Sequence, residues 1–127
     1  MKESILVIGA NGQIGTELVE ELRHRHGEST VIATDIKPAN AALEGTGPFE
    51  QVDVLDTSGL HEVMRRNNVK QVYLLAALLS ATAEQKVKTA WRLNMEGLLG
   101  VLDLAREQSF KLFWPSSIAV FGPTTPR

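Results

Sequence analysis

The sequence predicts an α/β domain in which a doubly wound, mostly parallel sheet carries helices on both faces. Two observations support this prediction. Short apolar segments rich in β-branched residues alternate with longer segments of helical periodicity, and glycine, serine or aspartate stands where most apolar segments end. Such alternation is typical of parallel strands joined by helices, and right-handed crossovers would place the first strand centrally. The 127 residues suit one domain.

An amphipathic helix is expected between the first two strands. Residues 5–8 are apolar and β-branched, as in a buried strand. The helix that follows carries an apolar stripe at helical spacing, formed by Ile14, Leu18 and Leu22. Its polar residues, Arg23 among them, are expected on the other faces. The helix ends near Gly27, and residues 30–34 form the second predicted strand.

The remaining elements follow the same alternation. Residues 37–48 contain prolines and glycines and are expected to form a loop, with a short third strand at 49–54. Asp56 is a favoured capping residue and is expected to begin a second helix, whose apolar positions are Leu60, Val63 and Met64. Further strands are expected at 70–77 and 110–114, separated by a long helix over residues 83–108.

Composition argues against several functional classes. The net charge of −2 offers no basic excess for a nucleic-acid partner, and the absence of cysteine excludes disulfides and thiolate chemistry. The longest apolar run, residues 72–79, is much shorter than the roughly 20 residues that span a membrane, and no signal peptide is evident. His24 and His26 stand two apart, a poor spacing for a metal site. We expect a cytoplasmic, soluble protein without a metal.

A glycine-rich turn joins the first strand to the first helix. Gly9, Gly12 and Gly15 leave room for backbone N–H groups to approach a pyrophosphate, which the positive end of the helix also attracts. The pattern predicts a Rossmann-type dinucleotide site, and a tight turn without a ligand is the alternative. The other residues expected to contact the cofactor here are Asn11, Gln13 and Ile14.

Two aspartates at strand ends are placed to contact the adenosine half. Asp35 follows the last glycine by about 20 residues and would accept hydrogen bonds from the ribose hydroxyls. Its charge would repel a 2′-phosphate, which favours NAD over NADP, although Lys37 weakens this argument. Asp53 ends the third strand and is interpreted as an acceptor for the adenine amino group, unless it merely ends the strand. Their neighbours Ile36 and Val54 are expected to contact the cofactor as well.

Polar residues in the second half are candidates for the reaction itself. Asn94 falls on an apolar stripe of the long helix, where a buried amide needs partners; a shallow, solvent-reaching position is the alternative. Ser116 and Ser117 follow the fifth strand, where a hydroxyl can hydrogen-bond a substrate oxygen. From the residues alone, ordinary turn chemistry is the favoured explanation for these serines.

Taken together, these residues resemble the extended short-chain dehydrogenase/reductase family, over the whole chain. The three glycines match its TGxxGxxG motif, although Ile8 replaces the threonine. The resemblance implies NAD as the cofactor, Asp35 as the ribose carboxylate and the pair at 53–54 as the adenine contact. It also implies that the end of the fourth strand lines the cofactor through Leu75, which replaces a common histidine, Ala76 and Ala77.

The same resemblance assigns roles around the reacting centre. Ser117 begins a segment similar to the family's S-x-x-V-[YF]-G and is implied to be the catalytic serine, with Ser116 as its neighbour and Asn94 as the structural asparagine. Segments 76–81 and 113–123 resemble short-chain L-threonine 3-dehydrogenases, in which a serine at the position of Ser80 contacts the amino acid. The implied reaction oxidises L-threonine to 2-amino-3-ketobutyrate.

Two alternatives to a threonine dehydrogenase stay open. One is a nucleotide-sugar epimerase or dehydratase of the same family, so the small-molecule substrate is either an amino acid or a nucleotide sugar. The other is a non-catalytic dinucleotide-binding module. The family's general base is a tyrosine with a lysine four residues later. Tyr73 lies within a predicted strand, and the residue four positions later is Ala77. We therefore expect residues 1–127 to be the NAD-binding domain, truncated before the catalytic tyrosine and the substrate-binding part.

A second apolar stripe on the long helix predicts self-association. The first stripe, expected to face the sheet, consists of Ala90, Gly97, Leu98, Val101, Leu102 and Ala105. The second consists of Trp91, Met95, Leu98, Leu99 and Leu102. Since a helix covers a sheet with one face only, an additional apolar face indicates a partner. The family resemblance implies a homodimer through this helix, residues 83–108.

Overall fold

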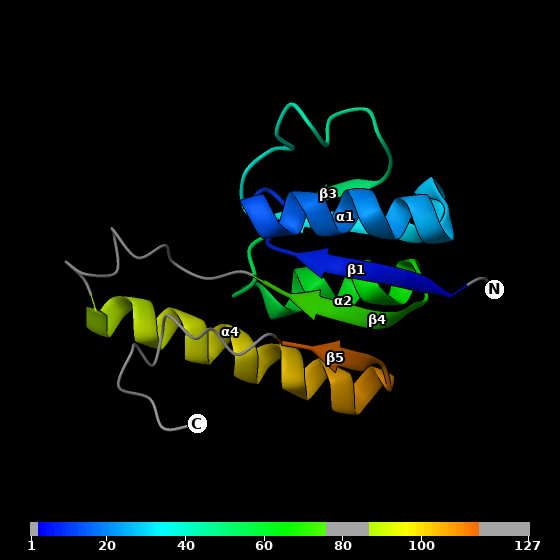
Figure 1. The fold of residues 1–127 in the computed structure, drawn as a ribbon. Coiled ribbons are helices and arrows are strands. Elements are labelled where there is room, and N and C mark those ends of the chain that lie inside the picture. The colour runs from blue at the N-terminus through cyan, green and yellow to red at the C-terminus, as the bar shows by residue number, and fades with distance from the viewer. Residues whose placement is uncertain (1–2, 76–86, 115–127) are drawn as a thin grey trace, which may run out of the picture.

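The computed structural model describes residues 3–75 and 87–114, and for residues 87–94 it describes the backbone alone. Strands and helices alternate along the chain, as the sequence predicts (Figure 1). In chain order the elements are β1 (Ser4–Ile8), α1 (Gln13–His26), the 3-10 turn η1 (Glu28–Thr30), β2 (Val31–Asp35), β3 (Phe49–Gln51), α2 (Thr57–Arg66), β4 (Val69–Leu74), α4 (Val87–Gln108) and β5 (Lys111–Phe113).

The five strands form one sheet in the order β3-β2-β1-β4-β5. Every neighbouring pair is parallel, and Val7 in the central strand β1 lies between Ala33 of β2 and Tyr73 of β4. The strands therefore present their carboxyl ends at one edge, on the left in Figure 1. This arrangement confirms the predicted doubly wound sheet with β1 at its centre, where the chain reverses its direction of winding.

Two apolar cores lie on the two faces of the sheet. Alternate residues of a strand point to opposite faces, so β1 sends Ile5 and Val7 into one core and Leu6 and Ile8 into the other. The first core contains Val19 and Leu22 of α1. The second contains side chains of α2 and α4, namely Leu60, Val63, Met64, Leu98, Val101 and Leu104. Helices thus cover both faces, as expected.

The buried face of α1 agrees with the predicted stripe at Leu18 and Leu22 but not at Ile14. Gly15, Val19, Leu22 and Arg23 are the buried residues of this helix, whereas Ile14 is 71% exposed. The physical reason is the close contact of the first turn with the strand end, because Gly15 lies directly against the backbone of Gly9 and Ala10. The buried stripe therefore begins at Gly15, one residue later than the spacing of the apolar residues indicates.

Arg23 was expected on an outer face of α1 but is buried. Its guanidinium donates to the carbonyl oxygens of Val31, at 3.1 Å, and Pro48, at 2.6 Å, and to Oγ1 of Thr46, at 2.8 Å. Burial lowers the pKa of Arg23, and the carboxylate of Glu28 opposes this shift. Because a guanidinium stays protonated in proteins, its fixed donors fasten the end of the loop 36–48 to β2.

The helices on the other face confirm one prediction and correct another. Asp56 caps α2 by accepting a hydrogen bond from Gly59 N at 3.0 Å. In α4, Leu98 and Val101 are buried as expected, but Leu102 is 43% exposed and Leu104 replaces it in the core. Leu102 was assigned to both stripes, and a position three residues after the exposed Leu99 belongs to the outer face only.

Several boundaries differ from the predicted ones. Thr30 belongs to η1, so β2 begins at Val31, and β3 ends at Gln51 because the next residues enter a turn in which Asp56 N donates to Asp53 O. β4 begins at Val69 and ends at Leu74, whereas the last two residues of the predicted fourth strand, 76 and 77, and the start of the predicted long helix lie outside the described residues. Within the part of the chain that the structure describes, no helix has the length and apolar character needed to cross a membrane.

Candidate nucleotide-binding site

The glycine turn lies at the carboxyl end of the central strand and is held there by β2. Gly9 N and Ala10 N both donate to Thr34 O, at 3.0 and 2.9 Å. Gly9 has a φ of 91°, a conformation that favours glycine. A Cβ at Gly15 would collide with the carbonyl oxygen of Gly9. Gly9 and Gly15 are therefore required by the protein's own packing.

Gly12 is different, because nothing in the described structure requires a glycine there. Its φ of −66° suits any residue, and the nearest atom to a Cβ at this position would be Gly9 O at an ordinary 3.6 Å. Gly12 also provides no side-chain cap for α1, whose first turn lacks acidic residues. The positive end of α1 is therefore open to an anion, and the missing Cβ leaves space in front of the turn. A pyrophosphate fits these features.

Asp35 lies beside this turn, where the sequence places it. Its Oδ2 accepts from Asn11 N at 2.9 Å, and its Oδ1 accepts from Ile36 N at 2.7 Å and from Lys37 N at 3.4 Å. An ionised carboxylate has about four acceptor positions, so capacity remains for another donor. Ile36 and Lys37 are both exposed at this edge.

Asp53 and Val54 form part of the turn between β3 and α2. Asp53 Oδ1 accepts from Leu55 N at 2.9 Å, which occupies part of the carboxylate. Val54 packs against the core, and a Cβ at Gly97 of α4 would lie 3.4 Å from it. Contact of this pair with adenine stays a prediction.

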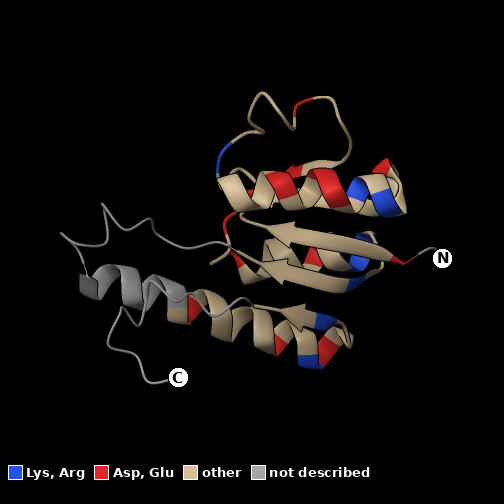
Figure 2. Ribbon diagram, viewed as in Figure 1, with Lys and Arg blue, Asp and Glu red and all other residues tan. Residues whose placement is uncertain are grey.

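Both signs of charge occur at both edges of the sheet (Figure 2). At the edge opposite the glycine turn, blue segments occupy the last turn of α1, and the exposed Glu28 follows them in sequence. That turn contains Arg23 and Arg25. The exposed Lys37 begins the loop that follows β2. Beside the glycine turn, the carboxylate of Asp35 accepts from Asn11 N, and Lys37 lies two residues later in the sequence.

Sequence reasoning identified Asn11 but missed Asn40, which binds it. Asn40 N donates to Asn11 Oδ1 at 2.9 Å, so the loop after β2 folds back onto the glycine turn. The surrounding segment, residues 37–48, carries prolines and glycines and no periodicity, so no pattern predicted this contact. Only the common occurrence of asparagine side chains in turns pointed to a local hydrogen bond.

Several predicted site residues lie outside the described residues: Ala76, Ala77, Ser80, Ser116 and Ser117. Asn94 belongs to α4, but its side chain is also outside the described part. Leu75 is described; its N–H donates to Ile8 O at 2.8 Å, which continues the line of β4 beside β1. The roles assigned to these residues stay predictions.

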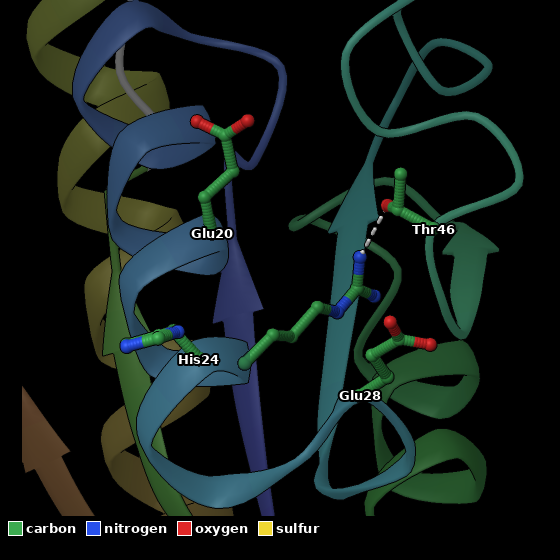
Figure 3. A pocket seen from close by; sticks show the side chains of 5 residues that line it. Glu20, His24, Glu28 and Thr46 are labelled. Carbon is green, nitrogen blue, oxygen red and sulfur yellow. Dashed lines mark hydrogen bonds between the residues drawn. The ribbon is translucent and has the colours of Figure 1, made fainter.

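A shallow hollow of about 250 Å³ lies at the other end of α1. It is lined by Glu20, Arg23, His24, Glu28 and Thr46, and the Arg23 guanidinium in it is bonded to Thr46 (Figure 3). Figure 3 shows His24 directed away from Thr46. Among the residues that the structure describes, no group of three or more His, Cys, Asp or Glu side chains suits a metal ion. The glycine turn, at the opposite edge, is the better candidate for a nucleotide.

Comparison with known proteins gives one family over almost the whole chain. Residues 5–127 match the NAD dependent epimerase/dehydratase family. A relative from Staphylococcus epidermidis, named Uncharacterized epimerase/dehydratase, is 49% identical over 98% of this chain and 40% of its own length. A relative from Staphylococcus saprophyticus with a similar name is 45% identical over 98% of this chain and 39% of its own length.

Solved structures with similar folds include dehydrogenases and epimerases. A partial consensus L-threonine 3-dehydrogenase is 52% identical, with a TM-score of 0.87 over 97% of this chain and 39% of its own. The holo GalE-like L-threonine dehydrogenase from Cupriavidus necator is 48% identical, with a TM-score of 0.87 over 97% of this chain and 40% of its own. UDP-glucose-4-epimerase from Stenotrophomonas maltophila, with bound NAD, is 25% identical, with a TM-score of 0.79 over 94% of this chain and 38% of its own. The chain thus spans about two fifths of the length of these proteins.

Proposed function

Because this chain belongs to the NAD-dependent epimerase/dehydratase family, we propose that its protein oxidises L-threonine to 2-amino-3-ketobutyrate, with NAD as the hydride acceptor. The observation that carries this choice of substrate is the difference in sequence identity among similar structures. The threonine dehydrogenases reach 52% identity, whereas the two UDP-glucose 4-epimerases reach 25% and 26%.

The described residues supply the binding half of this activity. In the proposal, the amides between Gly9 and Gly15 hold the pyrophosphate, Asp35 accepts from the adenosine ribose, and Asp53 with Val54 contacts the adenine. Leu75, which follows β4, is proposed to contact the cofactor together with Ala76 and Ala77. NAD, when bound in this way, accepts a hydride from the carbon that carries the substrate hydroxyl. The open helix end and the missing Cβ of Gly12 support the position of the pyrophosphate.

The reacting centre rests on the family resemblance. Ser117 is proposed to hydrogen-bond the substrate hydroxyl oxygen and hold it against the nicotinamide, with Ser116 beside it. Ser80 is proposed to contact the amino acid, and Asn94 to bridge backbone groups or water beneath the site. A hydroxyl in such a position orients the substrate, but it is not a sufficiently strong base to take the proton alone.

We infer that this chain alone does not turn over substrate. Loss of a hydride from an alcohol requires loss of the hydroxyl proton to a nearby base. Tyr73 is the single tyrosine, and its ring stacks on Phe113 with the centroids 4.7 Å apart. The residue four positions later is Ala77, which cannot lower the pKa of a phenol as a lysine does. These observations support the interpretation that Tyr73 is not the base.

Two other functions compete with this proposal. A nucleotide-sugar epimerase would begin with the same removal of a hydride, and a similar epimerase structure holds NAD. A non-catalytic module would bind the dinucleotide without turnover. The substrate that reacts separates the first alternative from threonine oxidation, and turnover itself separates both enzymes from the module. A cytoplasmic location, expected from the sequence, stays a prediction.

The test is made on this chain and on a protein extended to the length of the relatives. Threonine oxidation is followed by NADH absorbance, and conversion of UDP-glucose is followed by chromatography of the nucleotide sugars, because an epimerase returns the hydride and accumulates no NADH. L-Threonine and UDP-glucose are supplied separately, with Tyr73→Phe and Ser117→Ala variants of both proteins. We expect the extended protein to reduce NAD with threonine, to keep this activity in Tyr73→Phe and to lose most of it in Ser117→Ala. Turnover by the short chain, or turnover of UDP-glucose in place of threonine, would contradict the proposal.

A further inference from the structure

We propose that Asn40 is a positioning residue of the nucleotide site. By fastening the loop after β2 to the glycine turn, it holds the Asp35 carboxylate in place and so helps to select a ribose 2′-hydroxyl over a 2′-phosphate. This inference rests on the proposed binding of NAD at the turn, and it names a source of cofactor specificity that lies outside the glycine pattern and the ribose carboxylate.

Asn11 connects the glycine turn to the loop through its whole side chain. Its Nδ2 donates to Pro38 O at 2.8 Å and to Lys37 O at 3.3 Å, and its Oδ1 accepts from Asn40 N at 2.9 Å. Its backbone N–H is the group that donates to Asp35 Oδ2. The residue that orients the carboxylate is thus the residue to which the loop is bonded.

The side chain of Asn40 makes further hydrogen bonds from the loop to the glycine turn and to α1. Its Nδ2 donates to Asn11 O at 3.3 Å and to Thr16 Oγ1 at 3.0 Å, while its Oδ1 accepts from Leu43 N at 3.0 Å. Thr16 can accept because its own hydroxyl donates to Ala10 O at 2.8 Å. Both donors and the acceptor of the Asn40 amide are therefore used, which a nonpolar or shorter side chain cannot reproduce.

The carboxylate is held from two segments, and Asn40 joins them. Asp35 Oδ2 is bonded to the turn through Asn11, whereas Oδ1 is bonded to the start of the loop through Ile36 and Lys37. Loss of the Asn40 side chain would remove its bonds to Asn11 O and Thr16 Oγ1 and so loosen the turn that orients Oδ2. The two oxygens would then no longer be fixed together in front of the turn.

The rest of the loop is anchored independently, so the effect of Asn40 is local. Leu43 is 1% exposed and packs in the core below the loop. Farther along, Thr46 is bonded to the buried guanidinium of Arg23. These contacts keep the loop folded when Asn40 is changed. Asn11 Nδ2 and Gln51 Nε2 also still hold the carbonyl groups of residues 36–38, so the part that is loosened is the glycine turn around Asn11.

A shift of the glycine turn relative to Asp35 would change the charge that meets the 2′ position. Lys37 is exposed and lies two residues after Asp35. An ammonium group on a flexible stem is a good partner for a phosphate, whereas a fixed carboxylate repels it. A loosened turn would therefore weaken the bond from Asp35 to a ribose hydroxyl and allow the exposed side chain of Lys37 to approach a 2′-phosphate.

The test measures NAD and NADP affinity by calorimetry for the unmodified chain and for Asn40→Ala. We expect the preference for NAD to fall by about fivefold, the factor that corresponds to one net hydrogen bond, and to recover in part when Lys37→Gln is added. Thr46→Val is the matched control, because it removes a bond of the same loop at the far end, and it should leave the preference unchanged. Asn40→Ser, which keeps a hydroxyl near Leu43 N, serves if Asn40→Ala does not fold.

The outcomes separate this inference from the proposed function. A purely structural role would lower both affinities, or the melting temperature, without changing their ratio. If the unmodified chain prefers NAD and Asn40→Ala keeps the same ratio, the inference is overturned while the proposed function stands. It is also overturned if Thr46→Val lowers the ratio equally. If the unmodified chain binds neither nucleotide, the proposed function fails and this inference fails with it.

Discussion

Asp35 shows how one side chain can be oriented by backbone groups alone. Three backbone N–H groups, those of Asn11, Ile36 and Lys37, donate to its two oxygens. The spacing from Gly15 was enough to predict that this carboxylate would lie beside the turn. Its orientation was not predictable, because it depends on Asn11 and Asn40, which meet only after the loop has folded back. Sequence spacing thus located the carboxylate, and tertiary contacts fixed its orientation.

Replacement of Asp35 by alanine should remove the preference for NAD. The variant loses an acceptor for the ribose hydroxyls, for which a charged hydrogen bond is worth about 1.5–3 kcal/mol, and it no longer repels a 2′-phosphate. NAD affinity should fall about tenfold or more on this basis, while NADP affinity should hold or rise. Calorimetric titration with both nucleotides measures the change.

Asp56→Ala is the control for this experiment. It removes the cap of α2 and should destabilise the chain by about 1 kcal/mol without changing the ratio of NAD to NADP affinity. Stronger binding of NADP than of NAD by the unmodified chain would show that Asp35 does not contact the ribose.

At the scale of elements, the positions of the strands and helices followed from periodicity, and the buried face of α1 did so only in part. Leu18 and Leu22 pack against the core as predicted, but Ile14 is exposed. Gly15 takes the position against Gly9 and Ala10, and a glycine carries no hydrophobic signal. Arg23 was misplaced for a related reason, since its burial depends on the carbonyl groups of Val31 and Pro48 in other segments. Such partners are not visible in the periodicity of one helix.

The second and third glycines of the turn should respond differently to alanine. In Gly15→Ala the new Cβ meets the backbone of Gly9 and Ala10, so we expect a loss of about 1–3 kcal/mol in the free energy of unfolding. In Gly12→Ala the Cβ has room, and the loss should stay below about 1 kcal/mol. Urea denaturation of both variants checks this difference.

Binding should show a separate effect at Gly12. Its Cβ would enter the space proposed for the pyrophosphate, so Gly12→Ala should weaken NAD although the chain stays folded. Equal NAD affinity of Gly12→Ala and the unmodified chain would argue against a pyrophosphate at this turn, whatever the stability of the two proteins.

At the scale of the whole molecule, the feature that the fold does not explain is the exposed outer face of α4. Leu98, Val101 and Leu104 cover the sheet, whereas Leu99 is 55% and Leu102 is 43% exposed. The existence of an outer stripe was predictable from the number of apolar positions, because one helix buries only one face. Which residues belong to each face was not, since Leu98 and Leu102 fit both patterns.

We expect the chain to self-associate through this outer face. Leu99→Glu combined with Leu102→Glu should shift the protein towards the monomer, because buried carboxylates in an apolar contact are costly. Sedimentation velocity over a range of concentrations measures the change. Arg106→Gln, at an exposed position of the same helix, is the control. A strictly monomeric unmodified chain at high concentration would contradict the prediction.

The most direct test of the account is an amide-resolved NMR titration of this chain with NAD, which locates the site even when binding is weak. The account predicts that the largest shifts occur at Gly9 to Gly15, Asp35 and Ile36, with further shifts at Asp53 and Val54. The residues around the hollow of Figure 3, Glu20, His24 and Glu28, should stay unchanged. Shifts concentrated around that hollow, or no shifts at millimolar NAD, would contradict the central claim that the carboxyl edge of this sheet binds the dinucleotide.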